Sequence, residues 1–202
     1  MARSSRSSGP GGPGSPRARL FVALDPDPAD QAALAEWRDR AIAGRSDLRP
    51  VARESLHLTL AFLGYRPEKE VPAIEEAAFG ALAGAVPAAL DPVGIAPVPR
   101  RAPRLFALDL EDRGGAAGAV QSAVERALAE RRLHVPERRD WWPHVTIARV
   151  KRGARAEPLE LAPPPGPLHA GRVTLYRSIL RPQGALYVPL ARRALAPSPG
   201  DR

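Results

Sequence analysis

The chain carries the same short order of elements twice, and this internal repeat limits the folds that it can adopt. Each copy holds an apolar strand, then a helix-forming segment, then a strand with a His-x-Thr motif. A Leu-Phe pair recurs at an offset of 85, from Leu20 to Leu105, and the His-x-Thr recurs at an offset of 87, from His57 to His144. Two copies are too few for a solenoid. The repeats, at about 19–64 and 104–151, therefore indicate an internal duplication.

Hydrophobic periodicity predicts alternating strands and helices along the chain. Arg181-Pro182-Gln183-Gly184 is a turn signal, so the last two strands should form a hairpin. We expect strands at 19–25, 55–64, 104–109, 143–150, 172–180 and 185–190, and helices at 28–43, 68–83 and 115–132.

Composition sets the outer limits of the domain. Residues 1–17 are mostly Ser, Gly and Pro with no acidic residue, and they cannot bury enough apolar surface to offset the entropy of ordering. We expect a tail at 1–17, one domain at 18–192 and a loose tail at 193–202. The first tail lacks the apolar segment of a secretory signal, and no apolar run is long enough to span a membrane. We therefore expect a cytoplasmic protein with no membrane partner.

The two His-x-Thr motifs are the strongest chemical signal. The chain has four histidines and three threonines, yet two histidines are followed by Thr at the second position. Chance produces this in roughly one shuffled sequence in a thousand. Residues i and i+2 of a strand point the same way, so His57 shares a face with Thr59, and His144 with Thr146. Leu56, Leu58, Leu60 and Phe62 should form the opposite, buried face.

Two facing imidazoles suit acid–base chemistry on a phosphoester. A neutral imidazole can take a proton from a nucleophile while a protonated one gives a proton to the leaving oxygen. The hydroxyls can donate hydrogen bonds to oxygens that gain charge in the transition state. One alternative is that the histidines have a purely structural role. Another is a zinc site, but zinc needs three or four protein ligands. No spacing ties His134 or His169 to the pair, and we expect both on the surface or in loops. No metal or cofactor is expected.

The motifs His57-Leu58-Thr59-Leu60 and His144-Val145-Thr146-Ile147 resemble those of the 2H phosphoesterase superfamily. The match is to the RNA 2′,3′-cyclic phosphodiesterases, historically called 2′-5′ RNA ligases, and covers about 18–192. The resemblance implies an α+β fold with two pseudo-symmetric lobes, whose antiparallel sheets face a central cleft and carry helices outside. It also implies that His57 is the proton donor and His144 the proton acceptor.

The resemblance adds three candidate substrate contacts. Phe62 and Arg149 each stand five residues after a motif histidine, and in the family these positions contact the ligand. Arg149 stands an odd number of residues after His144, so a regular strand would point it to the opposite face. It needs a β-bulge or the strand end to reach the cleft. Phe21 is a further candidate, although its apolar neighbours favour a place in the core.

The partner that best fits the charge is an RNA end. The formal net charge is +8, and residues 131–155 hold eight basic groups against two acidic ones, with Trp141 and Trp142 among them. Such a surface suits phosphates and stacked bases. We expect a monomeric, metal-independent enzyme that opens RNA 2′,3′-cyclic phosphates to 2′-phosphates. The alternatives are the reverse 2′-5′ ligation, a 2H enzyme for a small cyclic phosphate or a 2′-5′ oligonucleotide, and a non-catalytic RNA-end binder.

Overall fold

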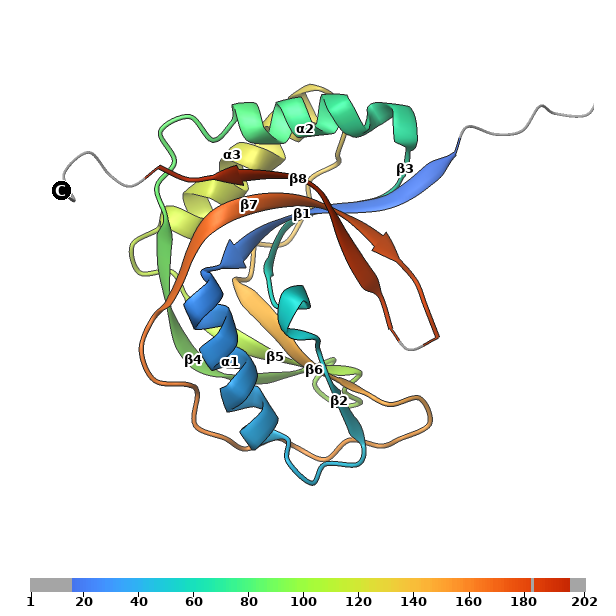
Figure 1. The fold of residues 1–202 in the computed structure, drawn as a ribbon, viewed down its shortest axis with the longest axis vertical. Coiled ribbons are helices and arrows are strands. Elements are labelled where there is room, and N and C mark those ends of the chain that lie inside the picture. Colours follow the sequence, from blue (N-terminus) through green and yellow to red (C-terminus); the bar gives the residue numbers. More distant parts are fainter. Residues whose placement is uncertain (1–15, 183, 197–202) are drawn as a thin grey trace, which may run out of the picture.

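A computed structural model describes residues 16–182 and 184–196 (Figure 1). Its strands pair antiparallel throughout, and three α-helices cover them. The strands are β1 (Arg17–Pro26), β2 (Leu48–Pro50), β3 (Leu58–Pro67), β4 (Ala88–Val98), β5 (Leu105–Glu111), β6 (His144–Val150), β7 (Leu168–Ile179) and β8 (Leu186–Ala194). The helices are α1 (Pro28–Ala41), α2 (Val71–Gly80) and α3 (Ala116–Glu130), with short 3-10 turns at Arg53–Ser55 and Glu68–Glu70.

The strands are arranged in two layers that spread apart from a shared junction (Figure 1). One layer has the order β3, β1, β7, β8, and the other has the order β4, β5, β6, β2. The layers touch where Leu58 of β3 pairs with Val145 of β6, and where residues 88–90 of β4 pair with residues 168–170 of β7. The expected bilobal α+β architecture is therefore confirmed.

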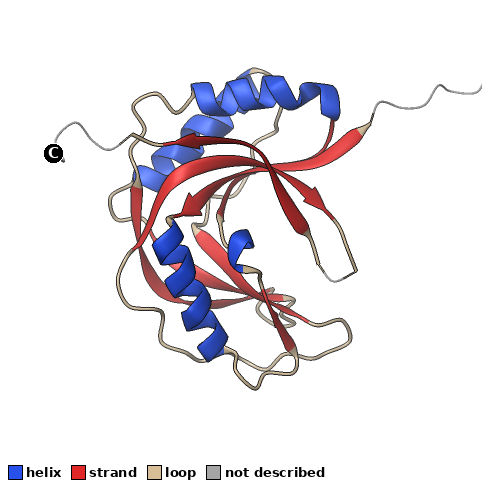
Figure 2. Cartoon of the chain, viewed as in Figure 1, coloured by secondary structure: helices blue, strands red, loops and turns tan. Residues whose placement is uncertain are grey.

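The helices lie on the outer sides of the layers (Figure 2). α2 and α3 cover the layer that contains β3, and the amide of Gln121 in α3 donates to the carbonyl of Leu60 in β3. A helix of the second repeat thus packs on a strand of the first. Burial of the apolar faces between helices and strands provides most of the driving force for this arrangement. The largest fully buried side chains include Phe106, Leu20, Leu24, Leu56, Leu58, Ile74, Leu90 and Leu108.

The predicted helices and the closing hairpin are present, but one long strand was missed. β4 contains Pro92, Gly94 and Pro97, which in sequence are typical of a loop. Its first three residues pair with β7 and the remainder pairs with β5, so that most of its length has one open edge. An edge tolerates proline because one side of the strand needs no backbone donor.

The expected C-terminal boundary was wrong by a few residues. β8 continues through Arg193 to Ala194, and the buried Leu195 donates its backbone N–H to the carbonyl of Gly171. The strand therefore holds residues that the sequence placed in a loose tail. The proposed N-terminal tail lies almost wholly outside the described residues. None of the described helices is long and apolar enough to cross a membrane.

Candidate active site

The two His-x-Thr motifs lie side by side at the junction of the layers. Leu58 and Val145, the residues between His and Thr in each motif, are paired across β3 and β6 and are fully buried. The histidines and threonines therefore point to the other face. Because the strands are antiparallel, the register brings His57 toward Thr146 and Thr59 toward His144. The four motif residues thus form one group.

Two matched β-bulges complete this face. Leu60 in β3 and Ile147 in β6, each three residues after a motif histidine, have no partner in the strand register. An extra residue reverses the alternation of the strand. Phe62 and Arg149, which come after the bulges, therefore reach the same face as the histidines. The bulge that Arg149 needs in order to reach this face is therefore present. The expected burial of Phe62 was wrong, because this residue is 43% exposed.

Each motif histidine is fixed through the same nitrogen. The Nδ1 atom of His57 lies 2.8 Å from the carbonyl oxygen of Ser55, and Nδ1 of His144 lies 2.8 Å from that of Trp142. A carbonyl only accepts, so Nδ1 carries the hydrogen in both rings. The neutral tautomer then leaves Nε2 unprotonated and available for proton transfer in both.

Aromatic side chains enclose His57. Its ring stacks on Phe21 at 4.9 Å between centroids, and Tyr187 meets it edge-on at 5.3 Å. Burial lowers the pKa of His57 to about 4, with smaller lowering by the charges of His144 and Arg149, while the bond to Ser55 opposes this. Phe21 is 3% exposed and also lines the site, so it supports the imidazole of His57 from the core side.

A buried carboxylate lies near this ring. Asp25 of β1 accepts hydrogen bonds from the hydroxyls of Thr174, at 2.6 Å, and Tyr176, at 3.1 Å, and from Arg172. Its negative charge raises the pKa of His57 and so partly offsets the burial. In the sequence, Asp25 marks only the end of the strand expected at 19–25.

The environment of His144 is more open. Its ring stacks on the indole of Trp142 at 4.1 Å, and the indole N–H of Trp142 donates to Asp109 at 2.6 Å. Burial lowers the pKa of His144, and the positive charge of Arg139 lowers it further. The hydrogen bond to the carbonyl of Trp142 and the negative charge of Asp109 act in the opposite direction. Both imidazoles are therefore neutral in the free protein at pH 7.

A small cavity of about 170 Å³ opens in front of His57. Thr59, Thr146 and Arg149 line it, and so does Arg19, whose guanidinium lies over the ring of Phe62 at 4.5 Å. The described residues around the cavity include two arginines and no carboxylate. Such a lining favours an anion of the size of a phosphate.

A large cavity of about 510 Å³ adjoins it on the side of His144. Thr59 and Phe62 line both cavities, while His57 lines only the small one and His144 only the large one. The two imidazoles therefore line neighbouring cavities that share Thr59 and Phe62. The structure brings His57, Thr59, His144, Thr146 and Arg149 together around these two cavities, and it places the other two candidate contacts, Phe62 and Phe21, beside them.

The two remaining histidines differ from each other. His169 is exposed and pairs with Asp30, as expected of a surface residue. His134 lies in a loop, but its side chain is only 7% exposed and contacts Glu125 at the wall of the large cavity. Only the folding of this loop against α3 produces that contact, so no local pattern indicates it. Within 16–182 and 184–196, no three His, Cys, Asp or Glu side chains are grouped to hold a metal ion.

Comparisons with known proteins show which family the chain resembles. The model of the 2′-5′ RNA ligase superfamily matches residues 26–179. An RNA 2′,3′-cyclic phosphodiesterase of Thermus thermophilus is 32% identical over 199 residues, covering 91% of this chain and 98% of the relative. A protein of the same name from Escherichia coli is 32% identical over 195 residues, covering 88% and 96%.

Solved structures show the same fold. The structure of Thermus thermophilus TT0787 superposes with a TM-score of 0.69 at 30% identity, covering 88% of this chain and 97% of the other. Escherichia coli LigT complexed with 3′-AMP gives a TM-score of 0.72 at 25% identity, covering 89% and 99%. The family model, the full-length relatives and the paired motifs agree, and the chain belongs to the 2′-5′ RNA ligase superfamily of 2H phosphoesterases.

Proposed function

We propose that this protein hydrolyses the 2′,3′-cyclic phosphate at the end of an RNA strand and leaves a 2′-phosphate. The observation that carries the proposal is the pair of histidines, each fixed through Nδ1, with His57 at a cavity lined by two arginines and His144 at the adjoining cavity. Relatives that cover nearly the whole chain and bear the name RNA 2′,3′-cyclic phosphodiesterase support it.

The reaction is a single displacement at phosphorus. Nε2 of His144 takes a proton from water, and the water oxygen forms a bond to phosphorus. The bond from phosphorus to O3′ breaks, and Nε2 of His57 gives its proton to O3′. Thr59, Thr146 and Arg149 donate hydrogen bonds to the phosphoryl oxygens, whose negative charge grows in the transition state. The roles of donor and acceptor follow the resemblance of the motifs.

Substrate binding prepares His57 for its role as donor. In the free protein burial keeps the pKa of this ring near 4, so that its Nε2 carries no proton at neutral pH. A phosphate anion in the small cavity favours the charged imidazolium and raises that pKa. The negative charge of the bound substrate therefore promotes protonation of Nε2 of His57, the proposed proton donor.

RNA as substrate is consistent with the arginines of the site and with the basic segment at residues 131–155. We further propose that the enzyme acts as a monomer in the cytoplasm, without a metal ion. Each repeat supplies one histidine of the pair, so a single chain contains the whole catalytic group.

Product analysis tests the proposed function against its alternatives. An oligoribonucleotide with a 2′,3′-cyclic phosphate is incubated with the enzyme and a second strand bearing a 5′-hydroxyl. We expect the 2′-phosphate to be the main product, separated from the 3′-phosphate by its resistance to a 3′-specific phosphatase. Joined strands as the main product would assign the protein to ligation. Absence of turnover would assign it to binding alone, and a much higher kcat/KM for a mononucleotide would favour a small substrate.

A further inference from the structure

The large cavity beside His144 is far larger than an attacking water requires. Its volume of about 510 Å³ lies in the range of sites that hold small organic ligands. Phe62, Trp141 and Trp142 line it and provide flat apolar surface. The indole N–H groups of Trp141 and Trp142 donate to Thr59 and Asp109, which fixes the orientation of both rings. Fixed rings of this kind are suited to stacking with a planar ligand.

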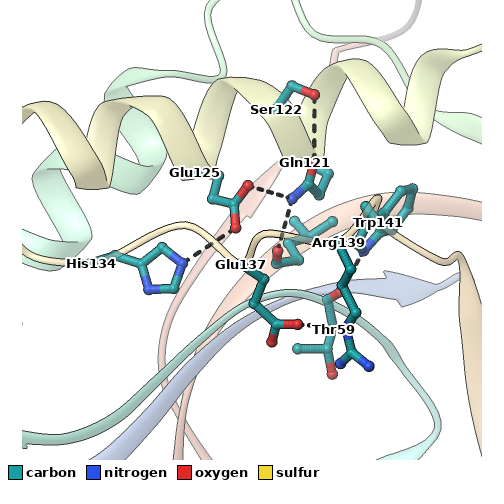
Figure 3. A network of polar contacts seen from close by, with 9 residues as sticks. Thr59, Gln121, Ser122, Glu125, His134, Glu137, Arg139 and Trp141 are labelled. Carbon is teal, nitrogen blue, oxygen red and sulfur yellow. Dashed lines mark hydrogen bonds and ion pairs between the residues drawn. The ribbon is translucent and has the colours of Figure 1, made fainter.

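Polar side chains of α3 and of the following loop form one wall of this cavity (Figure 3). Glu125 is at the centre of a network in which its Oε2 accepts from the amide of Gln121 at 3.0 Å and its Oε1 lies 3.3 Å from Nε2 of His134. Gln121 also donates to the carbonyl of Leu60, the bulge residue of β3. Glu125 is thus held in place on two sides and is still 21% exposed. A carboxylate has about four acceptor positions, so acceptor capacity remains toward the cavity.

The charges of the two cavities are opposite. The small cavity is lined by Arg19 and Arg149, with no carboxylate among its described residues. The large cavity is lined by three acidic residues and one arginine, namely Glu125, Glu137, Asp140 and Arg139, and Glu137 is paired with Arg139. The large cavity therefore disfavours a phosphate and favours a neutral, flat group that carries N–H donors.

We propose that the large cavity binds a nucleobase of the RNA end and that Glu125 selects for guanine. This inference rests on the proposed function, because the base is delivered by an RNA whose cyclic phosphate occupies the small cavity. Guanine presents N1–H and the N2 amino group side by side, which matches the two oxygens of one carboxylate. Uracil presents a single N–H between two carbonyl oxygens, and these oxygens repel a carboxylate. Adenine and cytosine present one amino donor beside an acceptor nitrogen and should be intermediate.

The test compares kcat/KM for four nucleoside 2′,3′-cyclic monophosphates and for four dinucleotides that end in uridine 2′,3′-cyclic phosphate and differ in the first base. A bidentate contact to a base is worth about 1–3 kcal/mol, which corresponds to a preference for guanine over uracil of roughly 5- to 150-fold. A preference in the mononucleotides places the terminal base in the cavity. A preference confined to the dinucleotides places the preceding base there. Equal kcat/KM for all bases in both series overturns the proposal.

A matched pair of variants assigns the preference to Glu125. Glu125→Gln keeps the size of the side chain but replaces one acceptor oxygen by a donor, so the guanine-to-uracil ratio should fall to below about twofold. Glu130→Gln removes the same charge from an exposed position on the same helix and should retain the wild-type ratio. A wild-type ratio in Glu125→Gln contradicts the proposal. The base series on the unmodified enzyme decides it even if the variant does not fold.

The proposed function and this inference fail in different ways. If no cyclic phosphate of either series is hydrolysed, the proposed function itself is wrong. If all are hydrolysed at similar kcat/KM, the proposed function stands and only the base-binding role of the large cavity is wrong.

Discussion

Alanine in place of either His57 or His144 should lower the rate of cyclic phosphate hydrolysis by roughly 10²–10⁴-fold. In the proposed mechanism both imidazoles act in the same displacement, one on the attacking water and the other on the departing O3′. The double variant should lose little more than either single variant, because the two residues act as a unit. Single-turnover rates on an oligoribonucleotide 2′,3′-cyclic phosphate measure these effects without interference from product release.

Two controls separate lost chemistry from lost structure. His169→Ala removes an exposed histidine that pairs with Asp30, and it should retain the wild-type rate within about twofold. His57 packs against aromatic rings, so its truncation leaves a cavity that can lower stability. His57→Asn preserves more of this volume and should be as inactive as His57→Ala. Turnover close to that of the wild type in any variant of His57 or His144 would reject the assignment of that residue.

Arg149→Ala should lower kcat by roughly 10²–10³-fold, which is the usual cost of removing a donor that stabilises charge in a transition state. The bulge at Ile147 brings Arg149 to the small cavity, which Thr146 also lines. Arg149→Lys should recover only part of the loss, because an ammonium group lacks the planar, bidentate geometry of guanidinium.

Arg126→Ala is the matched control for Arg149. Arg126 is exposed on α3, outside the residues that line either cavity, and its removal changes the net charge by the same amount. We expect its kcat to remain within about twofold of the wild type. An equal loss in both variants would mean that Arg149 acts only through the overall charge of the protein.

The grouping of the motif residues His57, Thr59, His144 and Thr146 was predictable from the sequence because strand alternation fixes it locally. His and Thr two residues apart share a face, and duplication supplied the second copy. Alternation failed at Phe62, which follows the bulge at Leu60 and therefore lines the two cavities instead of lying in the core. A bulge depends on pairing with a neighbouring strand, so it leaves no mark in the hydrophobic pattern. The bulge before Arg149 was predictable only by way of the resemblance. The resemblance places Arg149 at the ligand, whereas regular strand alternation would point it away from the face of His144.

Other features depend on contacts between distant segments. Asp25 lies about 150 positions from Thr174 and Tyr176 in sequence, and only the pairing of β1 with β7 brings them together. Glu125 and His134 meet because a loop folds back on α3. Propensity, periodicity and spacing report on neighbours along the chain. They therefore indicated the two His-x-Thr motifs but neither the residues that support them nor the large cavity.

The most direct test is turnover of an oligoribonucleotide 2′,3′-cyclic phosphate with EDTA present, across about pH 4–9. The donor must be protonated and the acceptor neutral, so the rate should depend on pH in a bell-shaped curve. The two apparent pKa values of this curve describe the pair of histidines together and not either residue alone. Burial lowers the pKa of both histidines, to about 4 for His57, so the optimum of kcat/KM should lie on the acidic side of neutrality. Bound phosphate raises the pKa of His57, so the optimum of kcat should lie at higher pH. The account predicts full turnover in EDTA with a 2′-phosphate product. Loss of turnover in EDTA, with recovery on adding zinc or magnesium, would contradict it.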